Sequence, residues 1–118
     1  MARARFTTAA AIAGLCVACA TTPSRYEWGD FESCIYDVTT NAGGVDVVAE
    51  IDRLTLVVEK ARESGKLVPP GLHAHLGYLY SLNGEVDTAV AAFESEKELY
   101  PESTVFIDGI LKRIEAQE

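Results

Sequence analysis

Two cysteines near the N-terminus are the residues whose type and spacing could most directly do chemistry. Cys16 and Cys19 lie three positions apart in the stretch GLCVACATT. Such a C-x-x-C pair can form a redox-active disulfide between a strand and a helix, or can supply half of a zinc site. The sequence offers neither the strand context nor a second pair of ligands. The segment that carries the two cysteines must therefore explain the spacing.

That segment has the layout of an export signal. Arg3 and Arg5 are followed by the small, apolar run TTAAAIAGLCVACA, which contains no acidic residue. A basic start followed by roughly a dozen apolar residues is typical of a signal peptide and is too short for a permanent membrane-spanning helix. The end of the run resembles a bacterial lipobox, in which a cysteine thiol receives a diacylglyceryl group and the cysteine becomes the first residue of the mature chain.

The two cysteines are expected to have different fates. Ala18, a small residue, precedes Cys19, whereas bulky Leu15 precedes Cys16. Cys16 stands where the lipobox usually has leucine, three positions before the modified cysteine. We therefore expect a signal peptide over residues 1–18, a covalent lipid carrying acyl chains such as palmitate on Cys19, and a short tether over residues 19–25. An unlipidated signal peptide or an uncleaved anchor is the alternative.

The remaining thiol and imidazoles are expected to be structural. Once Cys16 and Cys19 are assigned to the signal and the anchor, Cys34 has no disulfide partner, and its place beside an apolar stripe indicates a small buried hydrophobe. His73 and His75 are two positions apart in an apparent helix, so they do not share a face. We expect no metal site and no cofactor other than the lipid on Cys19.

Composition and charge narrow the classes of function. The chain has 118 residues, of which 48% are hydrophobic and 24% charged, values that fit one folded domain. Eighteen acidic residues against ten basic ones give a net charge of -8, which repels the phosphates of nucleic acids. No nucleic-acid partner is expected.

Catalytic motifs are absent from the sequence. It contains no G-x-S-x-G, no H-E-x-x-H and no phosphate-binding loop. Glu94, Glu96 and Glu98 alternate along one predicted helix and are expected to be solvated or to contact a partner. We therefore expect a protein that is not an enzyme and that has no small-molecule substrate.

Helical spacing dominates the rest of the chain. Apolar residues recur at three- and four-residue intervals over residues 28–38, 45–64 and 105–114, with a helix stop expected at Gly65. Tyr26, Trp28 and Phe31 are expected either to pack the first helix against the long second one or to belong to an interface. Val105 and Ile107 begin the apolar stripe of the terminal helix.

Residues 70–103 match the tetratricopeptide pattern at every interval: a leucine-glycine pair, a tyrosine three residues on, and then an alanine, a phenylalanine and a closing proline. The matching residues are Leu76, Gly77, Tyr80, Ala89, Phe93 and Pro101.

The residue types of this repeat have physical reasons. Gly77 and Ala89 are small where the two helices of a hairpin approach closely, and Gly84 can adopt the positive φ that the turn between them needs. His73 departs from the pattern where tryptophan is usual, and Glu96 departs where a small residue is common.

The expected fold class is all-α, with about five antiparallel helices in tetratricopeptide-repeat-like hairpins. One repeat cannot bury its own apolar face, so the preceding helix pair and the terminal helix are expected to stack on either side of it. Residues 26–118 should therefore form one helical-repeat domain.

A narrower resemblance covers nearly the whole predicted mature chain. The stretches YEWGDFESCIY, VPPGLHAHLGYLY and FESEKELYPESTVFID together resemble the bacterial lipoprotein family of domain of unknown function 4810. The resemblance implies a small, tetratricopeptide-type lipoprotein, often encoded beside a lipoprotein similar to the curli secretion component CsgG.

On this basis we expect a non-catalytic scaffold or assembly partner in an envelope complex, with protein partners that include a CsgG-like lipoprotein. The lipid would anchor it to the outer membrane rather than the inner one, because Ala20 and not aspartate follows Cys19. We expect it at the periplasmic face, although Ala20 does not decide between the two leaflets. The alternative is a periplasmic peptide-binding or regulatory module that acts on an envelope enzyme.

Overall fold

The computed structural model describes residues 22–117, which form an all-α fold. Within this range no β-strand is present, and the β-type backbone pairing is one isolated bridge between Tyr26 and Leu67. The elements are α1 (Phe31–Thr40), α2 (Val47–Ser64), α3 (Leu72–Leu82), α4 (Val86–Leu99), the short 3-10 helix η1 (Pro101–Ser103) and α5 (Thr104–Glu115). The predicted all-α class with five α-helices is therefore confirmed.

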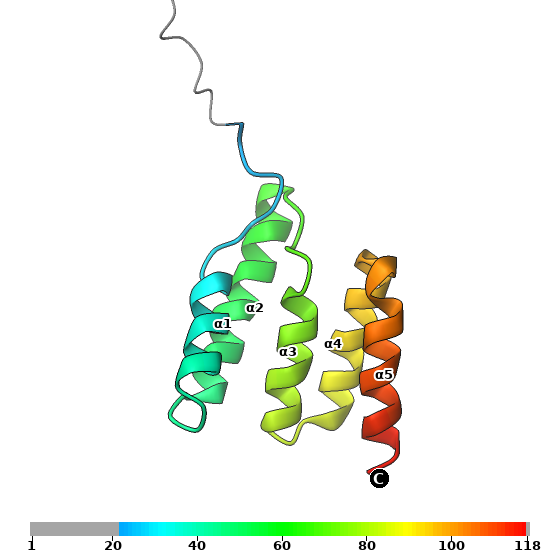
Figure 1. Cartoon of the computed structure of the whole chain (residues 1–118). Coiled ribbons are helices and arrows are strands. Elements are labelled where there is room, and N and C mark those ends of the chain that lie inside the picture. The colour runs from blue at the N-terminus through cyan, green and yellow to red at the C-terminus, as the bar shows by residue number, and fades with distance from the viewer. Residues whose placement is uncertain (1–21, 118) are drawn as a thin grey trace, which may run out of the picture.

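The five helices stand side by side in the order of the chain (Figure 1). Each α-helix contacts the one that follows it, and the most extensive contact is between α3 and α4. Two clusters of buried side chains hold the row together. Phe31, Leu54 and Leu79 belong to the first cluster, and Phe93 and Ile107 belong to the second.

Tyr80 links these two clusters, because its half-buried side chain packs against both. Apolar burial contributes about 25 cal/mol per Å² of surface removed from water, so a continuous core along the row stabilises all five helices together.

The first helix begins later than its apolar stripe predicts. α1 starts at Phe31, so Trp28 precedes the helix instead of lying within it. Phe31 is buried, whereas Trp28 is 39% exposed. The Trp28 ring stacks on Phe31 at a centroid distance of 6.3 Å, and Tyr26 meets Trp28 edge-on at 5.9 Å. The three predicted aromatic residues therefore form one cluster, with Phe31 on the core side.

Local signals fix both ends of α2. The Asp46 carboxylate accepts hydrogen bonds from the backbone N–H of Val48 (3.1 Å) and Ala49 (3.2 Å), which satisfies two free donors at the start of a helix. This cap places the start at Val47, two residues after the predicted position. Gly65 ends the helix with φ at 65°, as predicted from its lack of a side chain.

The segment before α1 is held against the connection between α2 and α3. Glu27 N–H donates to the Leu67 carbonyl at 2.9 Å, and Leu67 N–H donates to the Arg25 carbonyl at 3.1 Å. An ion pair between Lys66 Nζ and Glu27 Oε2 (3.2 Å) adds to them. Arg25, the last residue of the predicted tether, is therefore already fixed to the folded domain.

The contact between α3 and α4 depends on the absence of a side chain at Gly77. A Cβ atom built there would lie 2.8 Å from Cε1 and Cζ of Phe93, closer than real Cβ contacts come. The turn between these helices places Gly84 at φ 80°, in the left-handed region. Gly77 thus permits the close approach of α3 and α4, and Gly84 provides the turn between them.

We expect the substitution Gly77→Ala to lower the free energy of unfolding by about 1–2 kcal/mol, because overpacking against Phe93 outweighs the gain in helix propensity. Gly109→Ala is the matched control: this position also lies within a helix, and nothing surrounds its Cβ within 4 Å. It should raise stability by about 0.5–1 kcal/mol. Urea denaturation of both variants measures the difference in the free energy of unfolding. An equal increase for both would show that the Phe93 side chain moves aside without loss of stability.

Candidate apolar groove

An open groove runs across the face formed by α1, α3 and α5, with a volume of about 960 Å³. Most of its lining side chains are apolar or aromatic. We call this surface the apolar groove; it is lined by Trp28, Phe31, Ile35, Pro70, Gly71, Ala74, His75, Tyr78, Ser81, Phe93, Phe106, Ile110, Arg113, Ile114 and Gln117.

Large apolar side chains of the groove are exposed to solvent. Phe106 on α5 is 65% exposed, and Trp28, Ile35 and Tyr78 are also exposed. Single exposed apolar residues are ordinary on protein surfaces, but a contiguous group of this kind marks an interaction site. Aromatic residues are enriched at such sites because they bury much area with little loss of conformational freedom.

The two histidines lie on different sides of α3, as their spacing predicts. His75 lines the apolar groove, and His73 lines a smaller pocket of about 240 Å³ with Thr55 and Tyr80. Burial lowers the pKa of both imidazoles below 6.5, and nearby Glu50 and Glu96 oppose this only in part. The neutral imidazole is therefore favoured at neutral pH, as expected for side chains that pack between helices.

No group of three or more histidine, cysteine, aspartate or glutamate side chains within residues 22–117 is arranged to hold a metal ion.

Cys34, a residue of α1, is fully buried. Burial, together with the adjacent Glu50 carboxylate, raises the pKa of the Cys34 thiol to about 12. Because the thiolate is the reactive form, this cysteine is a poor nucleophile at neutral pH.

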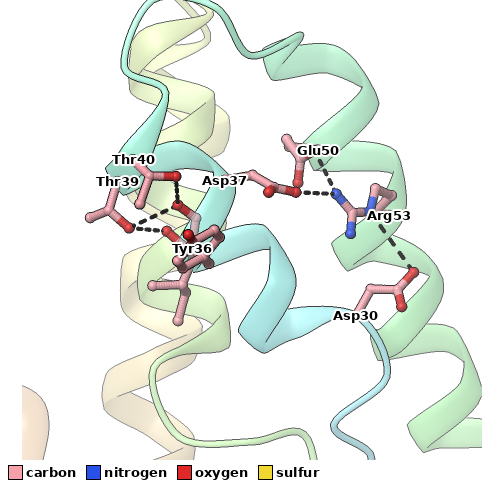
Figure 2. Close-up of polar contacts among 8 residues, drawn as sticks. Asp30, Tyr36, Asp37, Thr39, Thr40, Glu50 and Arg53 are labelled. Atoms are coloured by element: carbon pink, nitrogen blue, oxygen red, sulfur yellow. Dashed lines mark hydrogen bonds and ion pairs between the residues drawn. The ribbon is translucent and has the colours of Figure 1, made fainter.

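Arg53, which lies near Cys34, forms ion pairs with three carboxylates (Figure 2). Arg53 Nη1 lies 2.7 Å from Glu50 Oε1 and 3.3 Å from Asp37 Oδ2, and Arg53 Nε lies 3.8 Å from Asp30 Oδ2. Glu50 is only 6% exposed. The cluster joins α1 and its N-terminal end to α2. Because three carboxylates surround Arg53, its charge lowers the pKa of the Cys34 thiol less than burial and Glu50 raise it.

In the last turn of α1, hydroxyl groups bond to the backbone of the same helix. Thr40 Oγ1 donates to the Tyr36 carbonyl at 2.7 Å, as Figure 2 shows beside the arginine cluster. Such bonds satisfy the side-chain hydroxyl without reaching another helix. This end of α1 is therefore stabilised locally.

Glu96 corrects one sequence prediction. Its alternation with Glu94 and Glu98 predicts a position in solvent or against a partner, but Glu96 is only 2% exposed within the chain itself, whereas the other two are exposed. Its Oε1 accepts a hydrogen bond from Gly71 N–H at 2.7 Å, and its Oε2 accepts one from Ala74 N–H at 3.3 Å. The carboxylate thus caps the N-terminus of α3 from a neighbouring helix, where negative charge is favoured. Glu96, which stands where the repeat pattern usually has a small residue, therefore makes specific hydrogen bonds to α3.

The sequence profile of a family described as "Domain of unknown function (DUF4810)" matches residues 25–110. The chain belongs to the DUF4810 family. No curated protein and no solved structure matches it.

The matched region of this DUF4810 protein begins at Arg25, whose carbonyl pairs with Leu67, and ends at Ile110 in α5. It therefore includes the Glu96 cap, the arginine cluster and most of the apolar groove. None of the helices in residues 22–117 is both long enough and apolar enough to cross a membrane.

The repeat positions of the DUF4810 chain come together between α3 and α4. Four of them are buried, Tyr80 is half-buried, and Pro101 is exposed at the start of η1, just after α4 ends. The buried four are Leu76, Gly77, Ala89 and Phe93. Cys19, the predicted lipidation site, lies outside the described residues.

Sequence reasoning missed the apolar groove in this DUF4810 member. The terminal helix was expected to bury Val105, but that residue is exposed, and Ile107 is the buried one. Phe106 was assigned no role, although it is a large aromatic residue next to a predicted core position. An aromatic residue just outside the apolar stripe of a terminal helix was the available signal.

Proposed function

We propose that this DUF4810 protein is a non-catalytic assembly module of the bacterial cell envelope that holds a partner protein in its apolar groove. The observation that carries this proposal is the contiguous group of exposed, large apolar side chains on α1, α3 and α5, with Phe106 the most exposed among them. Burying such side chains against a partner supplies most of the binding energy at protein interfaces.

The arrangement of the helices supports a tetratricopeptide-like design. In this interpretation α1–α2 and α3–α4 are antiparallel hairpins, and α5 begins a third unit. The close contact between Gly77 and Phe93 supports the hairpin formed by α3 and α4. The first helix of each unit lines the groove, which is how stacked hairpins create an extended binding face.

A lipid on Cys19 would keep the groove close to the outer membrane, at the periplasmic face. Arg25, where the chain is fixed by its bond to Leu67, lies six positions after Cys19. An extended segment of this length spans about 20 Å. Each buried acyl methylene contributes about 0.8 kcal/mol, so several acyl chains anchor the acidic domain firmly.

The partner we propose is a lipoprotein similar to CsgG, which is what the family resemblance implies. The alternative function is a periplasmic peptide-binding or regulatory module acting on an envelope enzyme. The groove also has room for a short peptide, which is the observation in favour of this alternative. The two functions differ in whether the protein forms a stoichiometric complex that survives purification.

The substitution Phe106→Asp tests the proposal. We expect envelopes solubilised in mild detergent to yield the CsgG-like lipoprotein in stoichiometric amount with the unmodified protein, and about tenfold less or lower with Phe106→Asp. Phe106 is 65% exposed, so the substitution should leave the thermal unfolding midpoint unchanged.

Val48→Asp is the control, because Val48 is also exposed and also lies in the first turn of a helix, outside the groove. It should leave partner recovery intact. Equal recovery with both variants would remove the groove from the interface, and a stable monomer that binds only short peptides would favour the alternative function. An unmodified Cys19 in the mass spectrum of the recovered protein would overturn the lipid anchor.

A further inference from the structure

The apolar groove has a defined length along the helices that line it. Along α3 and its N-cap, the lining residues extend from Gly71 to Ser81. Along α5 and the two residues after it, they extend from Phe106 to Gln117. At a rise of 1.5 Å per residue, each wall is about 15 Å long. This length equals between two and three turns of an α-helix.

The groove offers few groups that could bond to a partner's backbone. Its lining side chains with polar atoms are those of Trp28, His75, Tyr78, Ser81, Arg113 and Gln117, and the other nine lining residues are apolar. An extended peptide buried there would leave most of its N–H and C=O groups unpaired, which is energetically costly. A helix satisfies these groups internally and presents only side chains to the groove. The lining therefore favours a helical occupant.

The charge at the groove is opposite to that of the whole protein. The chain carries a net charge of -8, yet no aspartate or glutamate lines the groove, and Arg113 is its one charged lining residue. Arg113 lies in the last turn of α5, is exposed, and forms no ion pair with any residue from 22 to 117. This end of the groove is complementary to a carboxylate.

We propose that the apolar groove binds an amphipathic helix of two to three turns from the partner protein, with an aspartate or glutamate of that helix paired to Arg113. The inference rests on the proposed function and names the chemistry of the partner's binding segment. Apolar side chains at positions i, i+3, i+4 and i+7 of the helix contact the aromatic lining, which includes Trp28, Tyr78 and Phe106.

The test uses the full-length protein in phosphatidylcholine vesicles and two synthetic helical peptides without tryptophan. Both peptides carry leucine at the four anchor positions. They differ only at the two residues that flank the apolar stripe, which are both glutamate in the first peptide and both lysine in the second. Trp28 is the only tryptophan of the chain and lines the groove, so its fluorescence reports binding there.

We expect the glutamate peptide to bind about threefold to tenfold more tightly than the lysine peptide. The net charge of -8 would by itself favour the lysine peptide, so this order isolates the effect of Arg113. Arg113→Glu should reverse the preference, whereas Lys112→Glu, the same charge change one residue away and outside the groove, should keep it. Phe106→Asp should abolish the Trp28 response to both peptides.

Equal affinity for the two peptides, or a preference that Arg113→Glu does not alter, would overturn the inference. Self-association that Phe106→Asp abolishes would assign the groove to a second copy of the chain and would also overturn it. If neither peptide binds while Phe106→Asp still abolishes partner recovery, the helical occupant is wrong and the proposed function stands. If Phe106→Asp leaves partner recovery intact, the proposed function itself fails.

Discussion

Replacing Glu96 with alanine is expected to lower the free energy of unfolding by about 3 kcal/mol, a value that urea denaturation can measure. The carboxylate accepts the backbone N–H groups of Gly71 and Ala74 at the start of α3 and is only 2% exposed. Its removal leaves both donors without a partner at a site that water reaches poorly. A domain of this size is stable by only about 5–10 kcal/mol, so this loss is a large share of the total.

Two further variants separate the cap from other effects of the substitution. Glu98→Ala removes an exposed carboxylate from the same helix and should change stability by less than about 0.5 kcal/mol. Glu96→Gln keeps the shape but loses the charge and should give an intermediate loss. If Glu96→Ala and Glu98→Ala proved equally stable, the bonds to α3 would contribute nothing to stability.

The second large effect is expected from Arg53→Leu, which should lower the free energy of unfolding by about 2–3 kcal/mol. Arg53 is the ion-pair partner of Glu50, whose other carboxylate oxygen is buried and has no hydrogen-bond partner in the described chain. Without the guanidinium, a buried carboxylate is left uncompensated. The Arg53 side chain is 31% exposed, so solvent screening keeps the expected loss below the full value for a buried pair.

Adding Glu50→Gln to Arg53→Leu should restore about half of the lost stability, because the double variant no longer buries an unpaired charge. Lys60→Leu is the control for losing a basic residue from α2, since Lys60 is exposed and forms no ion pair within residues 22–117. It should be nearly neutral. A double variant less stable than Arg53→Leu would mean that Glu50 has another favourable partner.

Features encoded by neighbouring residues were predictable from the sequence. Gly65 ends α2 and Gly84 forms the turn before α4, because each adopts a positive φ that other residues disfavour. Pro101 follows the end of α4, since proline cannot continue a helix. The spacing between Gly77 and Phe93 also anticipated their close contact. In each case the cause lies within one helical hairpin.

Features that depend on distant partners were not predictable in this way. The donors capped by Glu96 lie 25 and 22 positions away, and Asp37 lies 16 positions from Arg53. A charged residue in a helix looks the same in sequence whether it meets water or a buried N–H. The apolar groove was not predicted for a related reason. Part of the apolar surface of α5, including Phe106, is left exposed by the other helices of residues 22–117, and the spacing of apolar residues does not show which of them a neighbouring helix covers.

The pairing of residues 25–27 with the α2–α3 connection determines how tension at the N-terminus would spread through the molecule. A pull on the chain at residue 22 first strains the two backbone hydrogen bonds to Leu67 and the ion pair between Glu27 and Lys66. Tyr100 donates its hydroxyl to the carbonyl of Val68, which couples this connection to the end of α4. Tension therefore enters near the middle of the row of helices and reaches α1 only after these bonds break, so α1 is shielded from being peeled off first.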